Sequence, residues 1–365
     1  MLAMEGFLRL VVKEQASDLI VKTGAYPAVR INGLVRYISD EPVTKEMSLA
    51  FLNKILDEEG LEELAREGAV DKAVDLEGIG RFRCNVFRQQ GELGFVFRHI
   101  KAEIPSFKDL NLPVDPLKKL ASLRRGLVLA TGIAGSGKST TLAAMIDYVN
   151  RNLHRHVVTV EDPVEFIFQD KRSIINQREI GRDCPDFYTA LRHAVRQSPD
   201  IIFIGEMRDK ETVEAAISAA ETGHLVFSTL HTVNAVQTVE RIVTFFPPHQ
   251  HQLVRLQLSL NLAGVISLRL IRVKNGTGLM PAVELLMNTP TVREILAEGR
   301  TRELPKALFE GQYYGTMTFN QSILKLYELG NITFEEAMAA SDNPDELKLL
   351  MRGITSGAAS ARKTV

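Results

Sequence analysis

Tryptophan is absent from this chain of 365 residues, and cysteine occurs only twice, at Cys84 and Cys184. A zinc module with four cysteine ligands is therefore excluded. The two thiols lie far apart in the sequence, and we expect both to be reduced in a cytoplasmic protein. The sequence thus indicates neither a disulfide framework nor a structural metal.

Long apolar runs and an excess of charge are also missing. No segment reaches the roughly 18 consecutive apolar residues of a membrane-spanning helix, and the first residues do not form the basic region of a secretory signal. We therefore expect no transmembrane segment. Lysine plus arginine number 44 and aspartate plus glutamate 45, a formal net charge of −1. No general attraction to nucleic acid is encoded, and no nucleic-acid partner is expected.

The chain is long enough for two or three domains. Its first hundred residues predict a small α+β domain over 1–103. Val29 and Ile31 lead into Asn32-Gly33 and a second apolar segment, which is a strong signal for a β-hairpin with a type I′ turn. The elements expected here are helices over 4–15 and within 45–67, and strands over 18–22, 28–31, 34–37, 69–76, 80–89 and 93–100.

Three prolines and no clear period within 104–116 predict a linker. Strands then alternate with helices over 117–288, which is typical of a parallel α/β sheet. The strands expected are 126–131, 156–160, 201–204 and 225–230, and the helices 140–146 and 212–222. Residues 289–355 form a helical segment with helices over 291–298, 303–310, 319–329, 333–340 and 344–351, and we expect the tail 356–365 to be disordered.

The stretch 132–139 fits the phosphate-binding pattern G-x-x-x-x-G-K-[ST] at every fixed position, between an apolar strand and a helix. Its backbone N–H groups and the helix N-terminus would hold a polyphosphate, Lys138 would reach the β- and γ-phosphates, and Ser139 would ligate magnesium. A plain glycine-rich turn would explain the glycines but not the Lys-Ser pair. The residues expected to bind ATP are Gly132, Gly135, Ser136, Gly137, Lys138, Ser139 and Thr140.

Hydrolysis needs acids at the same edge of the sheet. An aspartate usually follows the buried strand 201–204 in such proteins, but this chain has Gly205 followed by Glu206. We therefore expect Glu206 to hold Mg²⁺, directly or through water. Glu161 ends the strand before it in the sequence and is the candidate general base. Glu165 is interpreted as an exposed acid.

Two histidines flank the strand 225–230. His231 follows its carboxyl end, where a ring N–H could donate to the γ-phosphate, and a hydrogen-bonded structural residue is the equal alternative. For His224 we expect a structural role or a role in coupling.

These motifs resemble the signatures of the secretion ATPases of the type II/type IV pilus superfamily. Residues 132–139 correspond to Walker A, 159–166 to the Asp box, 200–209 to Walker B and 220–232 to the His box. The resemblance continues into the N-terminal domain, at 16–33 and 80–85. The superfamily's assembly ATPases carry a further N-terminal domain and a tetracysteine zinc site. This chain is therefore similar to the retraction branch, the PilT/PilU group.

The resemblance leaves the choice within that group open. Residues 196–200 and 258–262 are similar to the PilU side, and 205–209 to the PilT side. Residues 291–296 occupy the place of the PilT motif AIRNLIRE but differ in sequence. The retraction branch alone is therefore assigned.

Membership of this family implies a ring, usually a hexamer, of subunits with a PAS-like N-terminal domain and a RecA-like ATPase core. ATP and Mg²⁺ would bind at the domain interface. Arg83 and Arg98 correspond to the arginines that reach the nucleotide phosphates, although four arginines in this short region cannot all be catalytic. The implied function is ATP-driven retraction of type IV pili in twitching motility. The implied partners are the inner-membrane platform protein PilC, the pilus base and a paralogous retraction ATPase, at the cytoplasmic side of the inner membrane.

Two other functions stay open on the residues alone. One is a DNA-uptake or conjugation-type motor, which would show tight and salt-sensitive binding of DNA. The other is an accessory subunit that binds ATP and turns it over slowly, against which the presence of both Glu161 and Glu206 argues.

Overall fold

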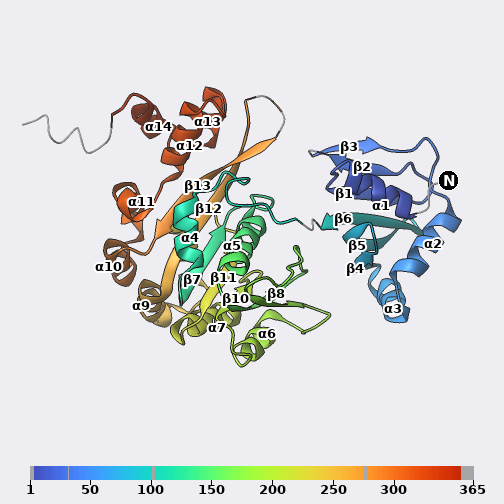
Figure 1. Ribbon diagram of the computed structural model, residues 1–365, viewed down its shortest axis with the longest axis horizontal. Coiled ribbons are helices and arrows are strands. Elements are labelled where there is room, and N and C mark those ends of the chain that lie inside the picture. Colours follow the sequence, from blue (N-terminus) through green and yellow to red (C-terminus); the bar gives the residue numbers. More distant parts are fainter. Residues whose placement is uncertain (1–3, 32, 101–102, 275, 277, 355–365) are drawn as a thin grey trace, which may run out of the picture. The chain divides into compact units, whose positions relative to one another are not determined.

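A computed structural model of the chain describes residues 4–31, 33–100, 103–274, 276 and 278–354. The predicted turn residue Asn32 and the predicted disordered tail 356–365 lie outside these residues. The chain divides into two compact units, Met1–Glu103 and Ile104–Val365, which are drawn in Figure 1.

The described residues of the first unit form a six-stranded antiparallel sheet and three helices. The strand order is β3-β2-β1-β6-β5-β4, and the fully buried rings of Phe82, Phe95 and Phe97 lie in its core. The predicted hairpin is present as the antiparallel pair β2 and β3. The elements are α1 (Met4–Lys13), β1 (Asp18–Lys22), β2 (Ala28–Ile31), β3 (Leu34–Tyr37), α2 (Lys45–Ile55), α3 (Glu58–Glu67), β4 (Ala69–Leu76), β5 (Gly80–Gln89) and β6 (Glu92–Ile100).

The helical stretch predicted over 45–67 consists of two helices, α2 and α3. Between them Leu56 adopts an extended conformation, and Asp57 caps α3 by accepting a hydrogen bond from the Gly60 N–H at 3.0 Å. Aspartate is favoured at this position because its carboxylate satisfies an N–H that the helix leaves unpaired. A local capping signal therefore breaks a segment whose overall periodicity is helical.

The second unit is built on a seven-stranded sheet in the order β13-β12-β7-β11-β10-β8-β9. All neighbours are parallel except β12 and β13, which form an antiparallel pair at one edge. The strands are β7 (Gly126–Thr131), β8 (His156–Glu161), β9 (Ile174–Glu179), β10 (Ile201–Ile204), β11 (Leu225–Leu230), β12 (Leu262–Arg272) and β13 (Leu279–Met287). The α helices are α4 (Val114–Ala121), α5 (Lys138–Asn152), α6 (Phe187–Ala194), α7 (Lys210–Glu221), α8 (Ala235–Thr244), α9 (His251–Asn261), α10 (Pro290–Glu298), α11 (Leu304–Glu310), α12 (Phe319–Glu328), α13 (Phe334–Ala340) and α14 (Pro344–Met351), and the short 3-10 helices are η1 (Pro248–Gln250), η2 (Thr301–Glu303) and η3 (Gln312–Tyr314).

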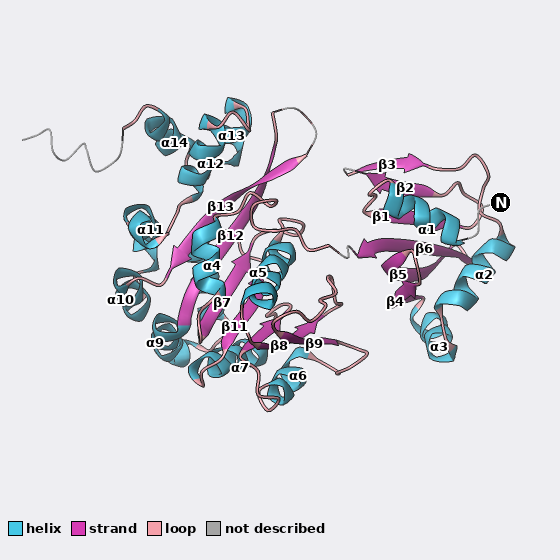
Figure 2. Ribbon diagram, viewed as in Figure 1, coloured by secondary structure: helices cyan, strands magenta, loops and turns pink. Residues whose placement is uncertain are grey.

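Helices cover both faces of this sheet (Figure 2). Successive residues of β7 point to opposite faces: Leu127 and Leu129 lie in the core under α7 to α11, and Val128 and Ala130 in the core under α4 and α5. A strand covered on both faces is apolar throughout, which is why its sequence shows no alternation. The predicted α/β class, with a smaller α+β domain and a helical C-terminal segment, is confirmed.

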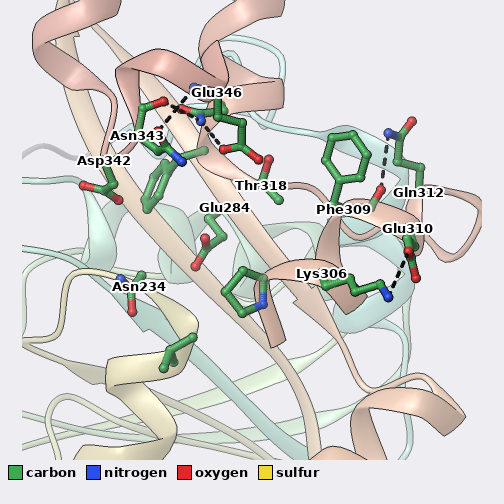
Figure 3. A pocket seen from close by; sticks show the side chains of 14 residues that line it. Asn234, Glu284, Lys306, Phe309, Glu310, Gln312, Thr318, Asp342, Asn343 and Glu346 are labelled. Atoms are coloured by element: carbon green, nitrogen blue, oxygen red, sulfur yellow. Dashed lines mark hydrogen bonds and ion pairs between the residues drawn. The ribbon is translucent and has the colours of Figure 1, made fainter. Parts of the chain in front are cut away.

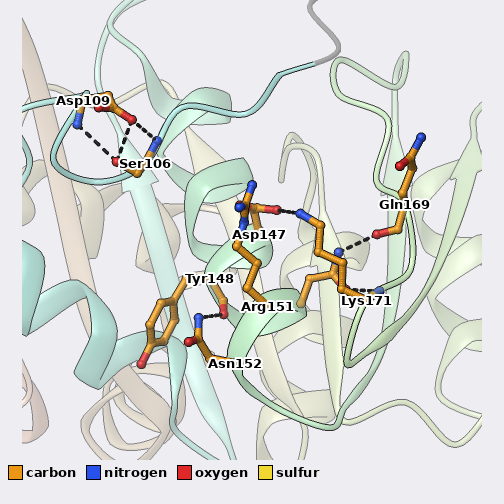
Figure 4. A network of polar contacts seen from close by, with 9 residues as sticks. Ser106, Asp109, Asp147, Tyr148, Arg151, Asn152, Gln169 and Lys171 are labelled. Atoms are coloured by element: carbon orange, nitrogen blue, oxygen red, sulfur yellow. Dashed lines mark hydrogen bonds and ion pairs between the residues drawn. The ribbon is translucent and has the colours of Figure 1, made fainter.

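The segment 104–116 differs from the predicted linker. It belongs to the second unit, and α4 begins within it at Val114. Phe107 and Leu112 are buried in the core beside α5, and Ser106 N–H and Oγ donate to Asp109 Oδ2 at 2.9 and 2.6 Å (Figure 4). The prolines and the lack of periodicity indicated a linker, but the segment is an irregular part of the second unit, held in its core by Phe107 and Leu112.

A polar network fixes the C-terminal half of α5, the helix that follows the phosphate-binding loop. Asp147 is almost buried and accepts hydrogen bonds from Arg151 Nε at 2.5 Å and Lys171 Nζ at 2.8 Å (Figure 4). Asn150 accepts from the Lys171 N–H and donates to the carbonyl of Gln169. The helix is thereby tied to the connection between β8 and β9.

Within the described part of the chain, no helix has both the length and the apolar composition needed to cross a membrane.

Candidate functional site

The predicted motifs meet at one edge of the second sheet. The phosphate-binding loop follows β7, and His231 directly follows β11. Glu206 is the second residue after β10, and Glu161 is the last residue of β8. These four strands are neighbours in the order β7-β11-β10-β8 and run parallel. Their carboxyl ends therefore lie side by side, which is where ligands bind in such sheets.

Glycine is required in the phosphate-binding loop for steric reasons. Gly132 has a φ of +146°, and a Cβ there would lie 2.6 Å from the carbonyl oxygen of Leu268. Gly137 caps α5 with a φ of +96°. Beside these glycines the buried Ser136 Oγ has no hydrogen-bond partner among the described residues. The loop thus offers a free hydroxyl and the N-terminus of a fifteen-residue helix to an anion.

Lys138 lies folded against the same loop. Its Nζ donates to the carbonyl oxygens of Gly132 at 2.9 Å and Ile133 at 3.0 Å. Burial lowers the pKa of Lys138, while the carboxylates of Glu206 and Glu165 oppose this change. The ammonium group is therefore held between the loop and two acids, where it can bind phosphate oxygens.

Glu161 is buried, with 5% of its surface exposed. Its Oε1 accepts from Thr159 Oγ1 at 2.6 Å and from Gln177 Nε2 at 3.3 Å, and its Oε2 accepts from the Glu165 N–H at 3.4 Å. Burial raises its pKa to about 7, and these hydrogen bonds oppose the rise. A carboxyl group that titrates near neutral pH suits a general base.

Glu206 connects the Walker B motif to the His box. Its Oε1 lies 3.4 Å from His231 Nε2, and its Oε2 accepts from Arg208 Nε at 2.8 Å. The pairing of Glu206 with His231 joins two residues that were singled out separately in the sequence. His224 instead bonds the carbonyl of Ala219 at 2.9 Å and Thr222 Oγ1 at 3.3 Å, in keeping with a structural part.

Two residues of the site were missed in the sequence. Glu165 is exposed as expected, but its Oε1 also accepts a hydrogen bond from Ser139 Oγ at 3.2 Å. Arg208 lines the same cavity as Glu206. Both belong to motif segments, so their position in the Asp box and Walker B was the available signal.

We call the space between these groups the phosphate cavity. It measures about 250 Å³ and is lined by residues of all four motif segments. A serine hydroxyl and the carboxylates of Glu165 and Glu206 give it the oxygen donors that Mg²⁺ prefers. The residues around the cavity that the argument uses are Lys138, Ser139, Glu161, Glu165, Glu206, Arg208 and His231.

Arg83 and Arg98 lie in the first unit. They are directly opposite each other on β5 and β6, so their side chains share one face of the sheet. Arg83 Nη2 is 3.4 Å from Asp71 Oδ2, and Arg98 Nε donates to the buried Asp18 at 2.9 Å. Their contact with phosphates stays a prediction.

Known proteins resemble the whole chain. The model of the family "Type II/IV secretion system protein" matches residues 8–318. The type IV pilus ATPase PilU of Pseudomonas aeruginosa is 39% identical over 95% of this chain and 91% of PilU. PilT of the same organism, a type IV pilus retraction ATPase, is 39% identical over 91% of this chain and 96% of PilT. A crystal structure of the pilus retraction motor PilT with bound ADP superposes with a TM-score of 0.88 at 43% identity, covering 95% of this chain and 99% of that chain.

The identity to PilU equals the identity to PilT, so the choice between them stays open. The family match includes both the β5–β6 region of the first unit and the phosphate cavity of the second. The chain therefore belongs to the type II/IV secretion system protein family, in its PilT/PilU group.

Proposed function

We propose that this chain is an ATP-hydrolysing motor that powers retraction of type IV pili. The observation that carries the proposal is the phosphate cavity, in which Lys138, Glu161, Glu206 and His231 come together from four adjacent strand ends. Relatives of nearly full length are named type IV pilus ATPases, so the predicted enzyme class is confirmed.

Four side chains of the cavity, those of Lys138, Glu161, Glu206 and His231, act in hydrolysis. The loop N–H groups and Lys138 hold the triphosphate, and Glu161 takes the proton of the attacking water. The ring of His231 donates to the γ-phosphate, and Glu206 sets the position of that ring through its contact at 3.4 Å. Burial of Glu161 keeps its basicity close to that needed at neutral pH.

Ser139 and Glu206 are the residues that would hold Mg²⁺, directly or through water. Bound there, the ion would neutralise charge on the β- and γ-phosphates. Glu165 orients the Ser139 hydroxyl through their hydrogen bond.

The working form is a ring, a hexamer of this chain. Arg83 and Arg98 stabilise the charge of the transferring phosphoryl group. The ring acts at the inner membrane on the platform protein PilC and the pilus base, with a paralogous ATPase as a further partner.

ATP turnover by the purified chain tests the site. We expect Lys138→Ala and Glu206→Ala each to reduce turnover by about a hundredfold or more. Lys325→Ala and Glu328→Ala, exposed residues at the end of α12, are the matched controls and should leave turnover within about twofold. Equal turnover in all four variants would refute the assignment of the site.

Deletion of the gene tests the direction of drive. Retraction predicts cells with excess surface pili and without twitching motility, whereas bald cells would indicate assembly. Salt-sensitive DNA binding would favour a DNA-uptake motor instead. Slow turnover by an intact ring would favour an accessory subunit.

A further inference from the structure

A second cavity lies in the ATPase unit and shares no lining residue with the phosphate cavity. It measures about 890 Å³, against about 250 Å³ for the phosphate cavity. Its walls come from β13, the start of α8, and the C-terminal helices α11, α12 and α14. We call it the C-terminal cavity. Its volume falls in the range of ligand-binding sites, and the nucleotide chemistry does not use it.

Four carboxylates surround this cavity at separate points, as Figure 3 shows. They come from four different segments, so a single small cation could not meet them together. A ligand with several positive groups spaced along it could. The carboxylates belong to Glu284, Glu310, Asp342 and Glu346.

Two of the four carboxylates form ion pairs. Arg269 Nη2 pairs with both oxygens of Asp342 at 2.8 and 3.0 Å, and Lys306 Nζ is 4.0 Å from Glu310 Oε1. By contrast, neither Glu284 nor Glu346 forms an ion pair within the described ranges.

The two unpaired carboxylates have neutral donors instead. Glu346 Oε2 accepts from Asn320 Nδ2 at 2.5 Å, and Glu284 Oε1 accepts from the Ala235 N–H at 2.8 Å. Burial raises the pKa of Glu284 to about 7, with a further rise from Asp342, while the Ala235 N–H and Arg269 oppose it. A cation that binds beside a buried carboxylate without an ion pair stabilises the charged form of that carboxylate.

Apolar side chains complete the walls, among them Val236, Phe309 and Phe319. Arg269 already lies over the ring of Phe319, 4.4 Å from its centroid, whereas no cation among the described residues stacks on Phe309. Lysine and arginine combine an aliphatic stem with a charged head, and the arginine guanidinium also stacks on aromatic rings. The cavity therefore offers both surfaces that such side chains use.

Four carboxylates are spaced around the cavity, two of them (Glu284 and Glu346) form no ion pair among the described residues, and the walls are partly apolar. From these observations we propose that the C-terminal cavity binds a lysine- and arginine-bearing segment of a partner protein.

The location gives this binding a route to the ATP site. Glu284 holds the Ala235 N–H at the start of α8, and Ala235 lies four residues after His231. Thr238 Oγ1 donates to the carbonyl of Asn234 and pairs with Thr232 Oγ1, each at 2.7 Å. An occupant of the C-terminal cavity therefore contacts the helix that fixes the loop carrying His231.

Binding of a fluorescent peptide tests the proposal. The probe is a short peptide in which lysine and arginine alternate with alanine, and its counterpart has glutamate at the cationic positions. At near-physiological salt we expect the full chain to bind the basic peptide and not the acidic one. The double variant E284Q/E346Q should weaken binding by about tenfold or more.

The control removes the same charge nearby. E335Q/E336Q neutralises two acids in the first turn of α13, outside the cavity lining, and should change binding by less than about twofold. Gln312→Lys adds a cation at an exposed lining position and should also weaken binding, without removing a buried group. Thermal unfolding checks that each variant is folded. No binding by the wild-type chain, or equal weakening by the cavity and control pairs, would overturn the proposal.

Discussion

The phosphate cavity and the C-terminal cavity each hold a glutamate whose pKa burial raises to about 7. Glu161 accepts hydrogen bonds from two side chains and one backbone N–H, and Lys138 lines the same cavity. Glu284 accepts a hydrogen bond from the Ala235 N–H, and no cation lies within ion-pair distance of it among the described residues. Side-chain and backbone donors orient the first carboxylate, for which we propose the role of general base, whereas the second forms no ion pair among the described residues. A similar rise in pKa therefore accompanies two different environments.

Of the changes predicted here, replacement of Glu161 by glutamine should have the largest effect, and that effect is on kcat. Glutamine keeps the shape of the side chain but cannot take a proton from water, so we expect kcat to fall by about 10²- to 10⁴-fold. Nucleotide affinity should change little, because Lys138 and the loop remain. Steady-state turnover and nucleotide titration measure the two effects. A kcat within about threefold of the wild type would remove Glu161 from the role of base.

The pH profile of turnover should follow Glu161. Because its pKa is raised to about 7, the basic form increases as pH rises through 7. We expect kcat to fall by about tenfold for each pH unit below this value. A profile measured from pH 5.5 to 8.5 tests this, and a flat acid limb would contradict it.

Thr159→Val should shift that profile. The Thr159 hydroxyl donates to Glu161 Oε1 at 2.6 Å, which favours the charged carboxylate. Without it the pKa of Glu161 rises further, so the acid limb should move to higher pH by about 0.5 to 1 unit. If the limb stays in place while kcat falls, the hydroxyl would act on the catalytic rate and not on the titration of Glu161.

The smallest effect is expected on stability, from Glu284→Gln. The carboxyl has an ordinary pKa of 4.5 and a folded-state pKa of about 7, so between these values the folded chain binds the proton more tightly. The free energy of unfolding therefore falls as pH rises from about 4.5 to 7, and a glutamine escapes this loss. The melting temperature of the variant relative to the wild type should rise by a few degrees between pH 5 and pH 8. An unchanged difference would indicate that Glu284 titrates normally.

Much of the ATPase core could be predicted because its strands are buried on both faces. The expected strands 126–131, 201–204 and 225–230 coincide with β7, β10 and β11, all of whose residues are buried. In contrast, β9 has one buried residue in six. It lies at the edge of the sheet, carries polar residues and gives no hydrophobic pattern.

Most of the residues to which we assign a role in the candidate site were singled out from the sequence, but their contacts were not, and Glu165 and Arg208 were missed. Periodicity and motif spacing placed Glu206 and His231 after separate strands, and only the sheet order brings them within 3.4 Å. The hydrogen bond from Ser139 to Glu165 likewise joins residues 26 positions apart. Local sequence carries no information on such pairs, because strand order decides which ends meet.

Residue types and their spacing were enough to predict a phosphate-binding loop, to single out Glu161 and Glu206 as candidate acids for hydrolysis, and to recognise the family to which these motifs belong. Each of these depends on residue types at short spacing, which fix local backbone geometry and chemistry. The tertiary structure decided which side chains share a cavity, how far burial shifts the pKa of Glu161 and Glu284, and that a second cavity lies beneath the C-terminal helices. Burial and enclosure arise only when distant segments pack together, so no stretch of sequence read alone contains them.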